Sequence, residues 1–435
     1  MPPRRLLLLS VVLSLACDGR GAQDRDGPLV ATRPEVLFLS PRSLDSAARR
    51  GDTLPRTLAD EPLRLVLQPR PLVAPGCTIL VLGDTAPATP CPTDLGTWSG
   101  GIASRTGWSQ VRLTFLPDGV IGTIRTGDDT WILEPRPDST PPPAGAIRHI
   151  AYRTRDVRGR IAFEGDTGAA DRPGEPAHQG WGPAQALRDD DDNRCDPHER
   201  PCDKPASGGG GPAPPPAPPP MLGIAMAADS EYIAQARLGM AFVQRQAAVL
   251  NMVDGMYHRE GIANFQVAVV IGDPLNQRFT ATTAGDLLDA LLPAFAAANL
   301  DLTVPANRVA RGVSTAFLTS GKRPQGNILG TAFEPGISGM AHQDFTFGVG
   351  ADAAAAIALQ NWMVMAHELG HSYNGAHDQA DSFCRFWFIW CWNPARTIMW
   401  PSYSFRTSPE FSRGYWDLSH NNRQRLRLHI PTRTP

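Results

Sequence analysis

Apolar and polar residues alternate in the first third of the chain, which is the pattern of half-buried β-strands. Residues 62–67 (PLRLVL), 78–82 (TILVL) and 108–115 (WSQVRLTF) are runs of this kind. Residues 120–133 (VIGTIRTGDDTWIL) predict two strands on either side of a Thr-Gly-Asp-Asp turn. The pattern therefore predicts a β-rich domain over residues 23–163.

The pattern changes from Met221 onward, where short apolar runs alternate with longer helical periods. The runs predict strands at residues 222–228, 265–272, 313–319 and 327–333. Helical spacing predicts helices from Glu231 to about His258, from Gly285 to Asn299 and from Ala351 to about Tyr373. This alternation predicts an α/β or α+β domain over residues 221–435, with helices packed against a mixed sheet.

Residues 164–220 lack large apolar side chains and are rich in Gly, Pro and Asp. They end in SGGGGPAPPPAPPP, a glycine-rich stretch followed by a polyproline spacer. This composition predicts a linker. The acidic run at 189–192 is better explained as a solvated turn than as a calcium site, because it lacks the alternating ligand spacing and the distal glutamate. Calcium binding elsewhere stays open.

The first 22 residues have the character of an export signal. Arg4 and Arg5 precede an apolar run over residues 6–16. That run is too short to span a bilayer, which needs about 20 residues as a helix, and no later stretch is apolar enough. We therefore expect an extracytoplasmic protein without a transmembrane span, either secreted or anchored to the cell envelope.

Two explanations remain open for the end of the signal. Residues 14–17 (SLAC) are similar to a bacterial lipobox in which Cys17 would be acylated, although Ser14 stands where that motif usually has leucine. The alternative is ordinary signal-peptidase cleavage at Ala16 or near Gly21. The first would give a lipid-anchored protein and the second a freely secreted one.

Charge and cysteine content narrow the partners and the compartment. The chain has 41 basic and 43 acidic residues, so its formal net charge of -2 predicts no attraction to nucleic acid. Besides Cys17 there are six cysteines, an even number that suits an oxidising compartment. Of the fifteen pairings that six cysteines allow, we favour the three local disulfides Cys77–Cys91, Cys195–Cys202 and Cys384–Cys391.

The chemistry is concentrated in the segment HELGHSYNGAHD at residues 367–378. His367 and His371 are four residues apart, so on a helix both imidazoles can reach one metal ion. Glu368 lies beside them, where it can take a proton from the attacking water and give it to the leaving amine. Asn374 and Gly375 both tolerate the backbone that ends a helix, and the turn can deliver His377 as a third ligand. Three protein ligands leave the fourth position of a zinc ion open for catalysis.

This segment resembles the long zinc motif of the metzincins, and specifically the adamalysin (reprolysin, ADAM) branch. The resemblance implies Zn²⁺ held by His367, His371 and His377, a zinc-activated water with Glu368 as general base, and a structural role for Asp378. Asn374 stands where the family usually has glycine, and asparagine is the next most tolerant residue for a positive φ.

Other parts of the chain are also similar to this family. Thr397-Ile398-Met399-Trp400 resembles the methionine turn beneath the metal, and residues 401–412 resemble the segment that shapes the specificity pocket. Residues 313–319 and 328–333 resemble the strands before the active-site helix, the second being the edge strand. Residues 122–136 and 149–156 resemble the family's pro-segment. No disintegrin or cysteine-rich module follows, so the chain resembles a minimal bacterial-type member.

The resemblance implies a zymogen of a zinc endopeptidase that acts on proteins or peptides, and we expect a monomer. One alternative is a catalytically silent surface module for binding or adhesion, which has no need of Glu368. Another is a zinc enzyme with a substrate other than a polypeptide, which the edge strand disfavours. Latency could come from a thiol of Cys195 or Cys202 at the zinc, or, if these two pair, from a pro-domain that covers the cleft.

Overall fold

The structure is a computed structural model of the 435-residue chain. It describes residues 27–83, 88–103, 108–127, 129–136, 143–162, 218–235, 241–322, 330–332, 347–351, 358–373, 375, 398–399, 402–403 and 422–429. The segment before Gly27, the region 163–217 and residues 376–397 lie outside the described residues.

The N-terminal part forms an eight-stranded sheet in which each strand pairs antiparallel with its neighbours. Side chains of this sheet form a leucine-rich core together with Leu44 and Ala48 of helix α1, Pro41–Arg49. The predicted β-rich region is therefore confirmed, as are the two strands expected within residues 120–133. In spatial order the strands are β2 (Glu35–Leu39), β11 (Ile147–Arg153), β10 (Asp129–Pro135), β9 (Gly119–Thr126), β8 (Ser109–Leu116), β7 (Thr97–Ile102), β4 (Glu61–Pro69) and β3 (Leu54–Leu58).

A second sheet has seven strands and is mixed. Its inner strands run parallel, and the two outer strands pair antiparallel with their neighbours. The apolar runs predicted as strands at residues 222–228, 265–272 and 313–319 are buried here, as expected for parallel strands covered on both faces. Of the predicted strand at 327–333, the structure describes residues 330–332, which form β16. In order they are β16 (Gly330–Ala332), β17 (Phe347–Ala351), β15 (Val313–Ser320), β13 (Met221–Ala228), β14 (Asn264–Gly272), β5 (Val73–Val81) and β6 (Thr89–Pro90).

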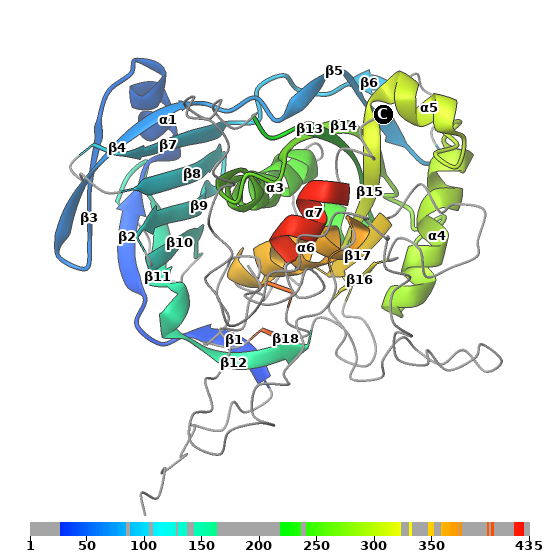
Figure 1. Ribbon diagram of the computed structural model, residues 1–435. Helices are drawn as coiled ribbons and strands as arrows, with labels where there is room; N and C mark the ends of the chain where they lie inside the picture. Colours follow the sequence, from blue (N-terminus) through cyan, green and yellow to red (C-terminus); the bar gives the residue numbers. More distant parts are fainter. Residues whose placement is uncertain are drawn as a thin grey trace, which may run out of the picture.

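Helices cover both faces of the mixed sheet. On one side α3 (Ala241–Arg259) and α6 (Ala358–Ser372) lie between the two sheets (Figure 1). On the other side α4 (Ala284–Ala297) packs its leucines against β13, β14 and β15. The remaining elements are α2 (Ser230–Gln235), α5 (Pro305–Arg311), α7 (Asn422–His429), the 3-10 turn Thr154–Asp156, and a small sheet of β1 (Gly27–Ala31), β12 (Val157–Ala162) and β18 (Ser402–Tyr403).

Two boundaries differ from the sequence prediction. Ala351 does not begin the active-site helix, because it ends strand β17 and pairs with Ser320 of β15. The alanine-rich composition favours a helix, but pairing with a buried strand overrides it here. The long helix expected from Glu231 is described as α2 and α3, with residues 236–240 outside the description.

The mixed sheet also contains strands from the N-terminal part. β5 runs parallel to β14, with Thr78 opposite Val269 and Val81 opposite Gly272. β6 extends the same edge, and the predicted disulfide Cys77–Cys91 connects the end of β6 to β5. The other two predicted disulfides involve cysteines outside the described residues. The regions 23–163 and 221–435, predicted as separate domains, thus share one sheet.

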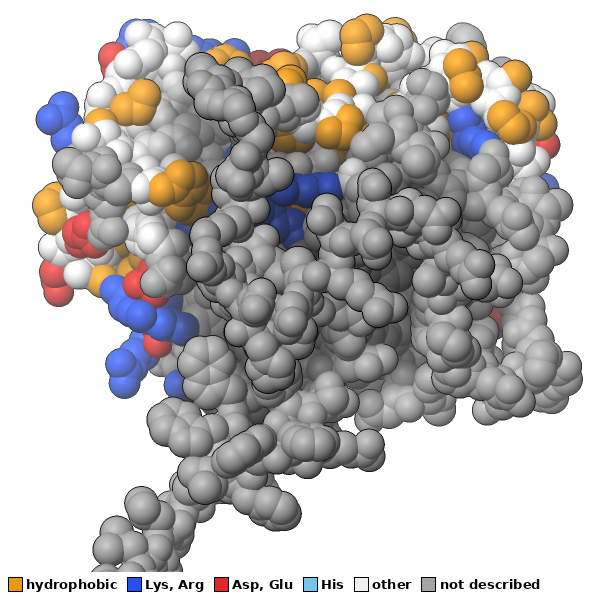
Figure 2. Space-filling model, in the orientation of Figure 1, with side chains coloured by type: hydrophobic (Ala, Val, Ile, Leu, Met, Phe, Trp, Pro, Cys, Tyr) orange, Lys and Arg blue, Asp and Glu red, His pale blue; other side chains and the backbone are white. Residues whose placement is uncertain are grey.

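The surface of the N-terminal sheet carries acidic and basic side chains mixed with hydrophobic ones (left side of Figure 2). None of the helices in the described residues is both long enough and apolar enough to cross a membrane.

Candidate metal centre

Helix α6 holds residues 367–372, the first part of the predicted motif, in the interior of the protein. Its apolar residues Leu359, Met363 and Leu369 are buried in the core that α6 shares with α3. The side chains of His367, Glu368, His371 and Ser372 are fully buried as well. A helix that buries two imidazoles and a carboxylate together needs strong compensating interactions, which points to a functional site.

The two histidines face each other one helical turn apart. Their Nε2 atoms are 3.0 Å apart, and their ring centroids are 4.6 Å apart. His367 Nδ1 lies 2.7 Å from the carbonyl oxygen of Ile398, and His371 Nδ1 lies 2.9 Å from that of Gly375. A carbonyl oxygen only accepts hydrogen bonds, so each Nδ1 carries a hydrogen; in the neutral form of each ring the Nε2 lone pair is then directed toward the other ring.

Two lone pairs at this distance repel unless an electrophile lies between them. A zinc ion with Zn–N distances of about 2.0–2.1 Å would hold two nitrogens about 3.3 Å apart in a tetrahedral site, close to the separation seen here. The Nδ1–H bonds to backbone carbonyls are also the contacts that usually orient metal-binding imidazoles. The residues therefore fit a zinc ion.

Residues that follow α6 in the chain contact the two histidines of the candidate metal centre. The Gly375 N–H donates to the Gly370 carbonyl at 2.7 Å, which turns the backbone so that the Gly375 carbonyl meets His371. A Cβ atom at position 375 would lie 2.8 Å from the Gly370 oxygen and 3.1 Å from the terminal methyl of Met399. Met399 is fully buried. Within the predicted methionine turn, Met399 thus lies against the end of α6, and the Ile398 carbonyl accepts the hydrogen bond from His367.

Two tyrosines that the sequence did not single out hold α6 in place. Tyr257 of α3 donates its hydroxyl to the Ala366 carbonyl at 3.0 Å, one residue before His367. Tyr373 donates its hydroxyl to the Ser314 hydroxyl at 2.9 Å, because the Ser314 hydrogen is donated to the Gly223 carbonyl. Burial, with the nearby Tyr373, raises the pKa of Tyr257 well above its usual value, so the hydroxyl remains a donor. No sequence motif marks these tyrosines, since their role depends on how α3 packs on α6.

The remaining predicted residues of the motif lie outside the described residues. These are Asn374, the third proposed ligand His377 and Asp378. Within the described part of the chain there is no group of three or more His, Cys, Asp or Glu side chains that could hold a metal ion. The structure therefore brings together His367, His371 and the neighbouring Glu368, and leaves His377 a prediction.

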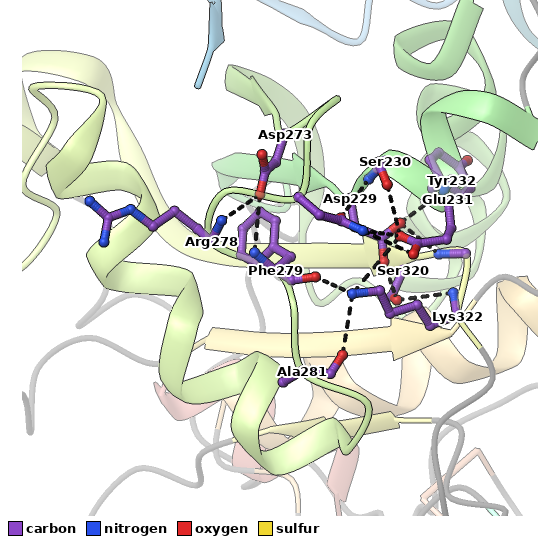
Figure 3. Close-up of polar contacts among 12 residues, drawn as sticks. Asp229, Ser230, Glu231, Tyr232, Asp273, Arg278, Phe279, Ala281, Ser320 and Lys322 are labelled. Atoms are coloured by element: carbon purple, nitrogen blue, oxygen red, sulfur yellow. Dashed lines mark hydrogen bonds and ion pairs between the residues drawn. The ribbon is translucent and has the colours of Figure 1, made fainter. Parts of the chain in front are cut away.

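A second polar cluster lies at the carboxyl ends of β13, β14 and β15, three inner strands of the mixed sheet (Figure 3). The Asp229 carboxylate accepts from the N–H groups of Tyr232 and Gly321 and from the Ser320 hydroxyl. Asp273 accepts from three successive N–H groups, those of residues 277–279. The Lys322 ammonium donates to the carbonyls of Phe279 and Ala281. The cluster ties the loops after the strands to one another.

Burial raises the pKa of Asp229 above its ordinary value of 3.8, and the neighbouring Glu231 adds to the shift. The hydrogen bonds from Gly321, Ser320 and Tyr232 lower it, but they do not cancel the desolvation. Carboxyl ends of parallel strands are common ligand sites, yet here the donors around Asp229 and Asp273 belong to the protein itself. The cluster is therefore a structural brace.

One family model matches the part of the chain that carries the motif. Residues 222–412 match the family Reprolysin_5, described as metallo-peptidase family M12. The matched segment begins within β13, extends beyond β18 and includes the candidate site. This match supports a metallopeptidase.

No curated protein matches the chain. One solved structure, "Structure of a chaperone-substrate complex", aligns with a TM-score of 0.28 and 14% identity over 38% of this chain. This chain spans 25% of the length of that one. The "Crystal Structure of metalloproteinase-II from Bacteroides fragilis" aligns with a TM-score of 0.41 and 10% identity, over 88% of this chain and 92% of that one. Both TM-scores are low, so the evidence for a metallopeptidase is the site geometry and the family match.

Proposed function

We propose that this protein is a zinc-dependent endopeptidase in which His367, His371 and His377 bind the metal and Glu368 is the general base. The observation that supports it most directly is the pair of Nε2 atoms 3.0 Å apart, each on a ring whose Nδ1 is committed to a backbone carbonyl. Both rings are buried on one helix together with Glu368. A structural zinc site would use four protein ligands, whereas three histidines leave one position for the reaction.

Each residue of the site has a distinct task in this proposal. Bound zinc would supply a Lewis acid that polarises the scissile carbonyl and makes water acidic enough to attack at neutral pH. Glu368 takes the proton from the attacking water and gives it to the nitrogen of the leaving amine. The carbonyls of Ile398 and Gly375 hold the imidazoles of His367 and His371 in the required tautomer.

The sheet edge beside α6 suits an extended peptide substrate. β16 is the outer strand of the mixed sheet and pairs antiparallel with β17 on its inner side. Helix α6 packs against both strands. An outer strand can add an extended peptide by backbone hydrogen bonds, which would hold its scissile carbonyl near the histidines. This is why we favour polypeptides over other substrates.

The rival function is a silent binding or adhesion module built on the same fold. Such a module would tolerate the loss of Glu368, and the buried carboxylate beside the histidines argues against it.

Export, cleavage or acylation at Cys17, and monomeric state remain part of the proposal. Labelled fatty acid on the mature chain that is lost in Cys17→Ser would support the lipid anchor, and a mature N-terminus beyond Cys17 would exclude it.

Cleavage of a peptide library by the full chain, with and without a chelator, tests the proposed function. We expect internal cleavage of peptides that stops with the chelator and returns when zinc is restored. Peptide binding without cleavage by the zinc-loaded protein, both uncut and cut within residues 163–217, would instead support the binding module.

A further inference from the structure

Strand β14 has the character of an interior strand, and one of its two neighbours comes from the N-terminal part. Its side chains are almost all buried, from Asn264 to Gly272, with β13 on one side and β5 on the other. The Val267 N–H donates to the Leu72 carbonyl at 2.6 Å, and the Leu82 N–H donates to the Gly272 carbonyl at 2.9 Å. Removing β5 would leave a long, apolar strand as an open sheet edge, which folded proteins avoid.

Helix α3 directs buried polar side chains toward the N-terminal part. The Asn251 amide donates to the carbonyls of Trp98 and Leu113, at 3.2 and 3.0 Å. The Asp254 carboxylate is fully buried and forms ion pairs with Arg70 at 2.8 Å and with Arg112 at 3.2 Å. A buried carboxylate that depends on two arginines from the other part of the chain is strongly destabilised when they leave.

The two parts also share one hydrophobic core. A single cluster of buried side chains contains Ile132 and Ile150 of the N-terminal sheet together with Trp362 and Leu369 of α6. In Figure 1, α3 and α6 lie directly between the N-terminal sheet and the mixed sheet. Separating the parts would expose this core to water on both sides.

The contacts of the N-terminal part are relayed to the candidate metal centre by α3. Asp254 and Tyr257 are three residues apart on this helix, so they lie on neighbouring positions of one side. Asp254 is held by Arg70 and Arg112, and Tyr257 donates to the Ala366 carbonyl next to His367. The N-terminal part thus supports the position of α6.

We propose that residues 27–162 are a permanent structural part of the domain that holds the metal centre. They stay bound to residues 218–435 when the chain is cut within residues 163–217. The protein after such a cut is a non-covalent two-chain assembly, with β5 and β6 still in the mixed sheet. Release from latency, where it occurs, then takes place without departure of the N-terminal part. This inference concerns association of the two parts and does not depend on the proposed peptidase activity.

The test uses the full chain with a specific protease site inserted in the GGGG stretch at residues 208–211. After cleavage, the sample is passed over a size-exclusion column in native buffer, and the two fragments are identified by mass. We expect both fragments in one peak at the elution volume of the uncut chain. Elution of the C-terminal fragment alone as a folded monomer would overturn the proposal.

A variant series then tests whether the named contacts hold the parts together. Arg70→Ala removes the two hydrogen bonds to Asp254 and one to Asn264. Arg50→Ala is the matched control, because Arg50 pairs with Asp52 on the N-terminal part itself. The cut Arg70→Ala protein should separate at a lower urea concentration than the cut control.

A second variant covers the case in which Arg70→Ala fails to fold. Gln110→Ala removes the hydrogen bond of 2.9 Å from the Gln110 amide to the Gly255 carbonyl on α3. It should shift separation in the same direction by a smaller amount. Separation of all variants at the urea concentration of the control would contradict the role given to this interface.

Discussion

The carbonyl oxygen of Ile398 lies 2.7 Å from Nδ1 of His367, although the two residues are 31 positions apart. This contact connects the turn at residues 398–399 to the helix that carries the motif. It fixes which nitrogen of His367 bears the hydrogen, and so directs the Nε2 lone pair toward His371. The bond explains why a turn so far along the chain belongs to the metal centre.

Replacing Gly375 by alanine tests the corresponding contact of the other histidine, between the Gly375 carbonyl and His371 Nδ1. The added Cβ would lie 2.8 Å from the Gly370 oxygen, so the turn must shift and the Gly375 carbonyl must move relative to His371. We expect zinc affinity to fall about 10–100-fold, the usual effect of losing such a supporting contact. Competition with a chromophoric chelator measures it.

Gly285→Ala is the matched control, because a Cβ there would meet nothing within 4 Å. Unchanged zinc affinity in Gly375→Ala would show that the 375 carbonyl does not orient His371.

His377→Ala tests the ligand that lies outside the described residues. With three histidine ligands reduced to two, we expect the purified variant to lose its zinc under conditions in which the wild type keeps one ion per chain. Metal analysis after dialysis measures this. Retention of one tightly bound zinc by the variant would remove His377 from the ligand set.

Asp229→Asn tests the polar cluster at the carboxyl ends of β13, β14 and β15. Burial raises the pKa of Asp229 in the folded protein, so folding binds a proton at pH values between the unfolded and the folded pKa. The stabilisation from this carboxyl is complete below about pH 3.8 and is lost as the pH rises through the raised pKa. Asparagine does not titrate; its Oδ1 can accept from the Tyr232 and Gly321 N–H groups, and its Nδ2 can donate to the Ser320 hydroxyl.

We therefore expect the variant to gain stability relative to the wild type as the pH rises from below 3.8 toward neutral. Urea unfolding at a series of pH values measures the difference in free energy. A difference that stays constant over this range would mean that the pKa of Asp229 is the same in the folded and the unfolded protein, so that burial does not raise it.

Thiol counting on the non-reduced full chain tests the proposed source of latency. We expect Cys195 and Cys202 to be oxidised, because they are seven residues apart and the proposed export would bring them into an oxidising compartment. Oxidation of both would exclude a cysteine thiolate at the zinc, and latency would have to come from coverage of the cleft. Two reactive thiols would restore that hypothesis.

Local signals were sufficient for much of the fold and for the centre of the site. The hairpin of β9 and β10 follows from alternation on both sides of a tight turn, and HELGH needs only helical spacing to bring His367 and His371 together. The disulfide Cys77–Cys91 was also predicted, since its cysteines are close in sequence.

Contacts between distant segments were not predictable in this way. Residues 78–82 were expected to form a strand, but nothing in them indicates that the neighbour is β14, whose paired residues lie 191 positions later. The support of α6 by Tyr257 likewise depends on how two helices pack. An apolar strand shows that it is buried without showing which strand lies beside it.

The most direct test of the zinc peptidase mechanism measures bound zinc and peptide hydrolysis in the same preparations of wild type and Glu368→Ala. Glu368 is placed for proton transfer and is not among the proposed ligands. The account predicts one zinc per chain in both proteins, with hydrolysis reduced about 10²–10⁴-fold in the variant. Undiminished hydrolysis by zinc-loaded Glu368→Ala would contradict it.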